Sequence, residues 1–312
     1  MAIKSFFKGA WALIKETFKG FTDHKITKLS GSLAYYTVFS MAPLLVVVIA
    51  LCGLFLEKEA IEGEVYEVLR GFMGENTALQ LQEIIKNAAL TGKKNFAALV
   101  GVITLLIGAT TVFAEIQDSI NSIWGLKPKP KRGWLKLLKD RVLSFSIIVS
   151  LGFLLLVSLA VTGLVEALNK RLQAMYPDVA LVIFYILNLV ITLGLSMLIF
   201  AVIFKVLPDA RIRWRNVIVG SFITSLLFLL GKFGISLYVS NSDIGSTYGA
   251  AGALAILLVW IYFSSIILYI GAEFTRAWSL QYGDEIRPSK HAVTTKEVEI
   301  ETGNAPVEKL EK

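Results

Sequence analysis

Ionisable side chains inside otherwise apolar stretches are the residues of this sequence that could do chemistry. Lys232 stands near the middle of one such stretch, and Glu115, Asp118 and Glu273 lie near the ends of two others. A lysine at membrane depth costs about 2.5–3.5 kcal/mol on insertion scales, so Lys232 has to be paired, hydrated or able to reach the interface. Such a lysine could neutralise an anionic headgroup, while the carboxylates could gate a path or exchange protons.

Uncharged polar residues follow the same stretches at helical spacing. Small and hydroxylated residues in such rows are either packing devices between membrane helices or the lining of a hydrated path, and both interpretations remain open. On the second interpretation, the cavity residues are Tyr36, Thr104, Glu115, Asp118, Asn188, Lys232, Tyr248, Tyr262, Tyr269 and Glu273.

A glycine-rich segment, NSDIGSTYGAAG at residues 241–252, is the other concentration of special residues. Its glycines free the backbone, and a helix that starts here directs free amides towards the segment. An anion site shared with Lys232 and an ordinary helix cap both explain the pattern. We assign structural roles to Pro43, Gly245, Gly249 and Gly252.

Known catalytic patterns are missing from this sequence. The chain has two histidines, His24 and His291, and the single cysteine Cys52, and it contains no HExxH, P-loop, GxSxG or Cys/His cluster. We therefore expect no enzyme, no catalytic residue, no metal and no cofactor.

Six apolar stretches must hold these residues in place. They are at about 33–56, 96–113, 142–165, 180–204, 217–239 and 250–270. Most exceed the roughly 20 residues that an α-helix needs to cross a bilayer. Only closed backbone structures are tolerated in lipid, and 55% of the residues are hydrophobic with a mean hydropathy of +0.66. The sequence therefore predicts an all-α, polytopic integral membrane bundle of six transmembrane helices.

Charge alternates between the connections. Lysines and arginines concentrate before the first span, at residues 127–141 and at residues 205–215, while the intervening connections are acidic or contain few bases. By the positive-inside rule both termini are cytoplasmic. The same rule explains the net charge of +7, so we expect no nucleic-acid partner.

The predicted organisation has three parts. Residues 1–29 form an amphipathic cytoplasmic helix whose apolar residues fall within about 80° of one another, residues 30–280 form the transmembrane domain, and residues 281–312 form a disordered cytoplasmic tail. The first helix either recognises anionic lipid or is a positional anchor. Two short helices are expected in the outer connection, residues 57–95.

Two stretches resemble the YihY/BrkB family of bacterial inner-membrane proteins, once mislabelled ribonuclease BN. They are LSGSLAYYTVFSMAPLL at residues 29–45 and STYGAAGALAILLVWIYFSSIILYIGAEFTRAW at residues 246–278, and the resemblance covers roughly residues 10–285. It implies a polytopic bacterial inner-membrane protein linked to envelope biology and to transport of lipid-like molecules, with no catalytic motif to transfer. The matching positions are Ala34, Tyr36, Pro43, Tyr248, Gly249, Gly252, Trp260, Tyr262, Gly271, Glu273 and Phe274.

Transport of an amphiphilic or lipid-like anion is the function that we predict from these features, by a secondary or passive route without nucleotide hydrolysis. A scaffold protein of the envelope and an ion transporter are the alternatives, and ribonuclease activity is not expected. The expected partners are membrane lipids and an anionic amphiphile. Small-residue faces allow a homo-oligomer without requiring one.

Overall fold

The computed structural model describes residues 2–52, 79, 111–128, 177–241, 252–282, 285–289 and 292–295. The predicted span at 142–165, most of the span at 96–113 and nearly all of the outer connection lie outside the described residues.

The described chain is mostly helical, as the sequence predicts. Its helices are α1 (Ala2–Asp23), α2 (Ile26–Cys52), a segment at 111–123, α7 (Pro177–Val206), α8 (Trp214–Asn241) and α10 (Gly252–Gln281). Within the described residues, three stretches are long and apolar enough to cross a membrane: Ile186–Val206, Trp214–Ile235 and Leu254–Gln281. These stretches overlap the predicted spans at 180–204, 217–239 and 250–270.

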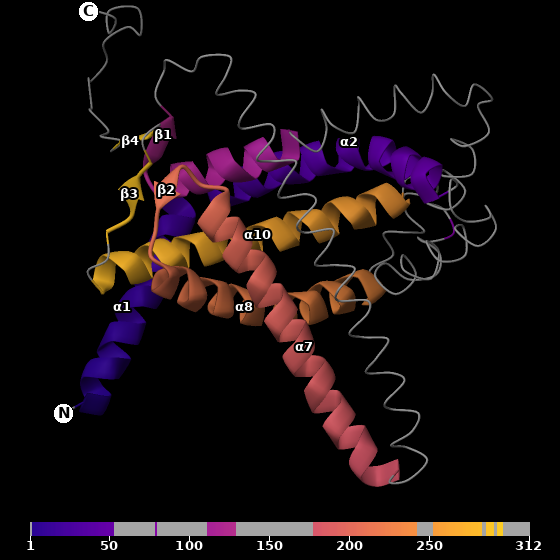
Figure 1. The fold of residues 1–312 in the computed structure, drawn as a ribbon, viewed down its shortest axis with the longest axis horizontal. Helices are drawn as coiled ribbons and strands as arrows, with labels where there is room; N and C mark the ends of the chain where they lie inside the picture. Colours follow the sequence, from indigo (N-terminus) through magenta and orange to yellow (C-terminus); the bar gives the residue numbers. More distant parts are fainter. Residues whose placement is uncertain are drawn as a thin grey trace, which may run out of the picture.

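Helix α10 lies at the centre of the described fold (Figure 1). It packs against α8, α2 and α1, while α7 packs against α8 and runs obliquely away from the other helices. The core includes Ile26, Ile120, Phe204 and Tyr269, which come from α2, segment 111–123, α7 and α10. Residues far apart in the sequence thus meet along one face of α10.

Small residues bring α8 and α10 into close contact. A Cβ atom added at Gly220 would overlap the Thr275 side chain, and one added at Gly271 would overlap Thr224. Each threonine hydroxyl donates to the carbonyl one turn earlier in its own helix, Thr224 to Gly220 and Thr275 to Gly271, both at 2.7 Å. The helices therefore approach closely without leaving these hydroxyls unpaired in lipid.

The first two helices join at a sharp break. Lys25 has a positive φ of 49°, which L-residues other than Asn, Asp and His adopt rarely. Ile26, the first residue of α2, is fully buried in the core. The amphipathic helix therefore ends at Asp23, earlier than the predicted boundary at residue 29, because Ile26 to Leu29 belong to the next helix.

Four short strands form two pairs, and two of these strands lie within the tail predicted to be disordered, at residues 287–288 and 292–294. β1 (Leu126–Pro128) pairs with β4 (Ala292–Thr294), and β2 (Ala210–Arg211) pairs with β3 (Arg287–Pro288), both antiparallel. Polar composition predicts disorder because such a segment buries little apolar surface. Here the segment gains main-chain partners from distant connections instead.

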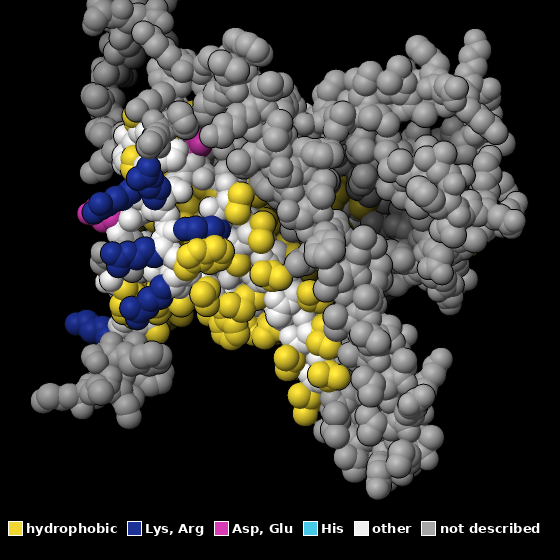
Figure 2. Space-filling view, viewed as in Figure 1, with side chains coloured by type: hydrophobic (Ala, Val, Ile, Leu, Met, Phe, Trp, Pro, Cys, Tyr) yellow, Lys and Arg dark blue, Asp and Glu magenta, His cyan; other side chains and the backbone are white. Residues whose placement is uncertain are grey.

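The side chains on the visible face divide into two zones (Figure 2). Lys and Arg gather at the end of the molecule where the strands and α1 lie, and apolar side chains cover the middle. Exposed apolar residues occur on all three candidate spans, including Val190, Leu230 and Leu258. A large exposed apolar surface of this kind fits contact with lipid rather than water.

The α8–α10 contact predicts a specific loss of stability. Gly220→Ala or Gly271→Ala should lower the free energy of unfolding by about 1–3 kcal/mol, because a methyl group overpacks the contact. Thermal unfolding of the detergent-solubilised protein measures this change.

Gly194→Ala is the matched control, because nothing lies within 4 Å of a Cβ atom there. It should be neutral or stabilising, since alanine favours helix more than glycine does. Equal effects of all three substitutions would contradict the close contact.

Candidate functional site

A buried ion-pair cluster joins α1 and the α1–α2 break to α10. The Glu273 side chain is 0% exposed, and its carboxylate contacts His24 Nδ1 and accepts a hydrogen bond from Arg276 Nε at 2.9 Å. Arg276 also approaches the partly exposed Glu16 of α1 at 3.4 Å. A buried carboxylate requires such partners because removing a charge from water is expensive. The cluster therefore fixes the start of the chain against the last turns of α10.

Gly20 permits this arrangement. An added Cβ atom at Gly20 would overlap the Glu273 carboxylate, so α1 can pass Glu273 closely only if residue 20 has no side chain. Nearby, Trp124 Nε1 donates to the Ala272 carbonyl at 3.0 Å and ties segment 111–123 to the same part of α10.

Three buried hydroxyls come from α2, segment 111–123 and α10. Among the described residues, the hydroxyls of Tyr269, Ser119 and Ser30 make no hydrogen bond of ordinary geometry, although Ser119 is the hydroxyl neighbour of Tyr269. Glu115 lies on the same segment, close enough to Tyr269 to interact with it electrostatically. Buried polar groups are usually satisfied, so the Tyr269 and Ser119 hydroxyls mark a place where a small polar ligand or a water molecule would find partners.

A second polar group holds the connection between α7 and α8. Asn121 donates to the Asp209 carboxylate at 3.2 Å and accepts from the Asp209 amide at 2.9 Å. Lys205 donates to the Ile212 carbonyl at 2.5 Å and lies 5.3 Å from the Trp214 ring centre. These contacts order the polar end of the described bundle.

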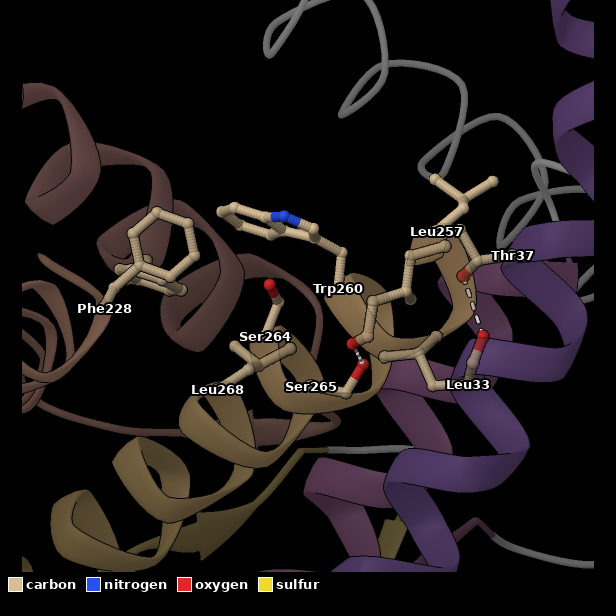
Figure 3. Close-up of a pocket in the computed structure, with 10 residues that line it drawn as sticks. Leu33, Thr37, Phe228, Leu257, Trp260, Ser264, Ser265 and Leu268 are labelled. Atoms are coloured by element: carbon tan, nitrogen blue, oxygen red, sulfur yellow. Dashed lines mark hydrogen bonds between the residues drawn. The ribbon is translucent and has the colours of Figure 1, made fainter. Parts of the chain in front are cut away.

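A cavity of about 450 Å³ lies between α2, α7, α8 and α10 (Figure 3). Its lining residues are Leu33, Thr37, Phe200, Phe228, Leu257, Trp260, Ile261, Ser264, Ser265 and Leu268. Most are apolar, and two of the three hydroxyls bond to their own helices, Thr37 to the Leu33 carbonyl at 2.7 Å and Ser265 to the Ile261 carbonyl at 2.6 Å. The cavity suits an apolar chain better than an ion.

The structure gathers part of the predicted site. Glu115, Tyr269 and Glu273 lie near one another at the polar end of α10, whereas Asp118 is exposed on segment 111–123. Thr104 and Tyr248 lie outside the described residues. None of the predicted cavity residues that the structure describes lines the cavity of Figure 3.

The remaining predicted residues lie on the outer faces of helices. The Tyr36 ring contacts Tyr35 edge-on at 5.6 Å and is partly exposed. Asn188 is exposed and accepts from Thr192 at 3.2 Å, and Tyr262 is half-buried. Periodicity places residues on one helix face, but it does not say which neighbour covers that face.

Lys232 differs from the interior lysine that the sequence suggests. Its side chain is exposed on α8, one turn beyond Phe228, which lines the cavity. Residues four apart lie on the same helix face, so Lys232 stands beside the cavity rather than inside it. A long side chain can keep its charge at the surface while its carbons cover apolar neighbours.

The predicted structural residues have mixed outcomes. Gly252 is buried at the first position of α10, and Pro43 lies inside α2. Gly245 and Gly249 lie outside the described residues. Among the described residues, no group of three or more His, Cys, Asp or Glu side chains is arranged to hold a metal ion.

Sequence reasoning missed several residues that organise the site. The sequence patterns assign no role to His24, Arg276, Asn121 or Asp209. Arg276 follows Glu273 by three residues, a helical ion-pair spacing that could have signalled the cluster. Nothing in the local sequence signals the pairing of Asn121 with Asp209.

A family comparison now identifies the chain. The model of the family described as virulence factor BrkB matches residues 17–295. The chain belongs to the BrkB family. As the resemblance predicted, both quoted stretches lie within the match.

Relatives of this BrkB-family protein are named UPF0761 membrane proteins. One from Vibrio parahaemolyticus is 30% identical over 279 residues, covering 85% of this chain and 82% of the relative. One from Alteromonas mediterranea is 26% identical over 303 residues, covering 93% and 96%. No solved structure matches the chain. With its apolar helices, this BrkB-family chain is a membrane protein.

The buried cluster predicts unequal effects of removing its two carboxylates. Glu273→Ala should lower the free energy of unfolding by about 3–5 kcal/mol, because Arg276 and His24 then lie beside a buried space with no carboxylate to bind. The matched Glu16→Ala, which removes a partly exposed partner, should cost about 0–1 kcal/mol.

Thermal unfolding in detergent compares the two variants, and limited proteolysis reports release of α1. If Glu273→Ala unfolds at the wild-type temperature with α1 still protected, the cluster does not hold α1 in place.

Proposed function

We propose that this BrkB-family protein transports an amphiphilic, lipid-like anion across the bacterial inner membrane by a secondary or passive route. The cavity between α2, α7, α8 and α10 is the observation that carries the proposal. No catalytic reaction or cofactor is assigned.

The cavity has the size and chemistry for part of an amphiphile. Its volume of about 450 Å³ falls within the usual range of small-molecule sites. Leu33, Phe228, Trp260 and Leu268 offer apolar contact, and Ser264 adds a hydroxyl from α10 (Figure 3). Such a lining favours an acyl chain and would exclude a hydrated ion, because the ion would lose water without gaining comparable partners.

Lys232 supplies the charge that an anionic headgroup requires. It stands one turn from Phe228 on the same face of α8, so a chain in the cavity could keep its headgroup at Lys232. The cation at the edge and the apolar lining would together select an amphiphile with negative charge.

Orientation in the membrane follows from charge. The polar end, where α1 meets the last turns of α10, carries the Lys and Arg side chains in Figure 2. The positive-inside rule supports placing this end in the cytoplasm, and six spans would then leave both termini on that side.

A scaffold role in the envelope is the second candidate. The hydroxyls of Ser221, Thr224 and Ser225 on α8 all donate to carbonyls of their own helix at 2.7 Å. These hydroxyls thus act in packing, which is what a scaffold requires. Transport measurements separate the two candidates.

Filling the cavity should stop transport. Ser264→Trp places a large ring among the lining residues, so we expect at least about a tenfold loss of lipid movement, comparable with the loss of one good binding contact. The assay follows fluorescent phospholipids in liposomes containing the purified protein, with and without a pH gradient.

Leu258→Trp is the matched control, because Leu258 is exposed on the same helix and does not line the cavity. It should transport like the wild type. Undiminished transport by a folded Ser264→Trp protein would contradict the cavity's role, and a folded wild type that moves no lipid would favour the scaffold.

Removing the charge should change selectivity. Lys232→Met should reduce movement of anionic phospholipid while leaving zwitterionic phospholipid unchanged, whereas Lys232→Arg should retain the preference for anionic lipid. The same assay, run with both lipids in parallel, measures the ratio of rates. An unchanged ratio in Lys232→Met would remove Lys232 from substrate recognition.

A further inference from the structure

Helix α1 has one face that docks on the protein. Leu13 and Thr17 are buried and Gly20 lies against Glu273 of α10. At the other end of this face, Gln281 donates to the Gly9 carbonyl at 3.2 Å. These contacts fix the rotation of α1 about its own axis.

The apolar stripe of α1 lies on a different face. Trp11 is 69% exposed, Ile14 47% and Phe18 70%, although these are large apolar side chains. At 100° per residue they lie within about 60° of one another, and the centre of this stripe lies roughly 125° from the centre of the docking face. The helix therefore does not use its most apolar residues to pack against α10.

A third face carries positive charge. Lys8, Lys15 and Lys19 are exposed, and their helical positions follow the apolar stripe on the side away from the docking face. Docking thus presents an apolar row and a basic row side by side, both directed outward. Figure 1 shows α1 extending away from the other helices.

We propose that this outward surface of α1 binds the anionic phospholipids of the adjacent membrane leaflet. Trp11, Ile14 and Phe18 enter the boundary between headgroups and acyl chains, and the three lysines contact the phosphate groups. Charge complementarity selects this occupant, because an apolar row flanked by lysines fits a negatively charged lipid surface. The proposal concerns a separate surface and does not rest on transport through the cavity.

Docking on α10 strengthens the argument against a simple anchor. A helix that served only as a tether could rotate freely, whereas the contacts of Glu16 with Arg276 and of Gly20 with Glu273 hold α1 in one orientation. The lipid-facing surface is thereby set before any lipid binds. A preorganised surface binds more tightly because less freedom is lost on binding.

Spin labels on the full-length protein in nanodiscs test the position of the stripe. The lone cysteine is first replaced, Cys52→Ala, and a label is then attached at Phe18→Cys or at the control Ala12→Cys, which is also exposed but lies beyond the lysines. We expect the label at position 18 to collide mainly with lipid-soluble oxygen and the label at position 12 mainly with a water-soluble nickel complex.

A lipid titration tests whether the lysines of α1 are required for binding anionic lipid. Phosphatidylglycerol and phosphatidylcholine are titrated into the detergent-solubilised full chain, and affinities are compared. Each lysine near an anionic surface contributes about 1 kcal/mol, or roughly fivefold in affinity. Replacing Lys8, Lys15 and Lys19 by Gln should therefore reduce the preference for phosphatidylglycerol by up to about 100-fold, whereas replacing them by Arg should preserve it.

Each alternative environment of the apolar stripe gives a distinct result in these experiments. A label at position 18 that water-soluble nickel reaches freely overturns the proposal, because the stripe then lies in water. A label that neither reagent reaches also overturns it, since a second copy or another part of the chain then covers the stripe. An equal preference for phosphatidylglycerol in wild type and the Gln variant removes the lysines from lipid recognition.

Discussion

The close approach of α8 to α10 is the constraint on which the rest of the described structure depends. Lipid offers no hydrophobic drive for helix association, so membrane helices rely on packing and on small residues at the contact. Here each helix places a glycine opposite a threonine of the other, and each threonine hydroxyl is satisfied within its own helix. Asn216 extends the same antiparallel contact by donating to Ser279 at 3.0 Å.

The two halves of α10, which packs against α8, have different roles. Residues 257–268 line an apolar cavity that α2, α7 and α8 complete. Residues 269–276 carry Tyr269, Glu273 and Arg276, and bind α1 and segment 111–123 through polar contacts. Polarity therefore changes along a single helix, from an apolar half that suits the lipid interior to a polar half that assembles the basic end.

The sequence predicted the three candidate spans of the described residues well, because length and hydropathy are local properties. The ends of those helices were predicted less well. The sixth span was expected to end at residue 270, but α10 continues to Gln281 because Glu273 and Arg276 find partners inside the protein and need no aqueous surface. Likewise the strand pairing of Ala292–Thr294 depends on residues more than 160 positions away, which no local pattern reveals.

The candidate site was predictable only in part for the same reason. Glu273 could be recognised from its charge in an apolar stretch, but its partner His24 lies 249 residues earlier. Rows of hydroxyl residues at helical spacing give the same sequence pattern whether they face water or protein. The glycines that mark the α8–α10 contact are visible in the sequence, but the threonines opposite them follow only from the register between the helices.

The described interior also bears on what could move through it. A hydrated path would leave hydroxyls free to bind water, yet Ser221, Ser225 and Ser265 donate to their own helices, and the cavity lining is largely apolar. An ion in this cavity would lose its hydration without replacement, whereas an acyl chain would lose nothing and gain contact area. The hydroxyls of Ser119 and Tyr269, which find no partner among the described residues, lie at the polar half of α10 instead. Among the transport hypotheses, the lining chemistry therefore favours an amphiphile, with its chain in the apolar half and its charge near a cation at the edge.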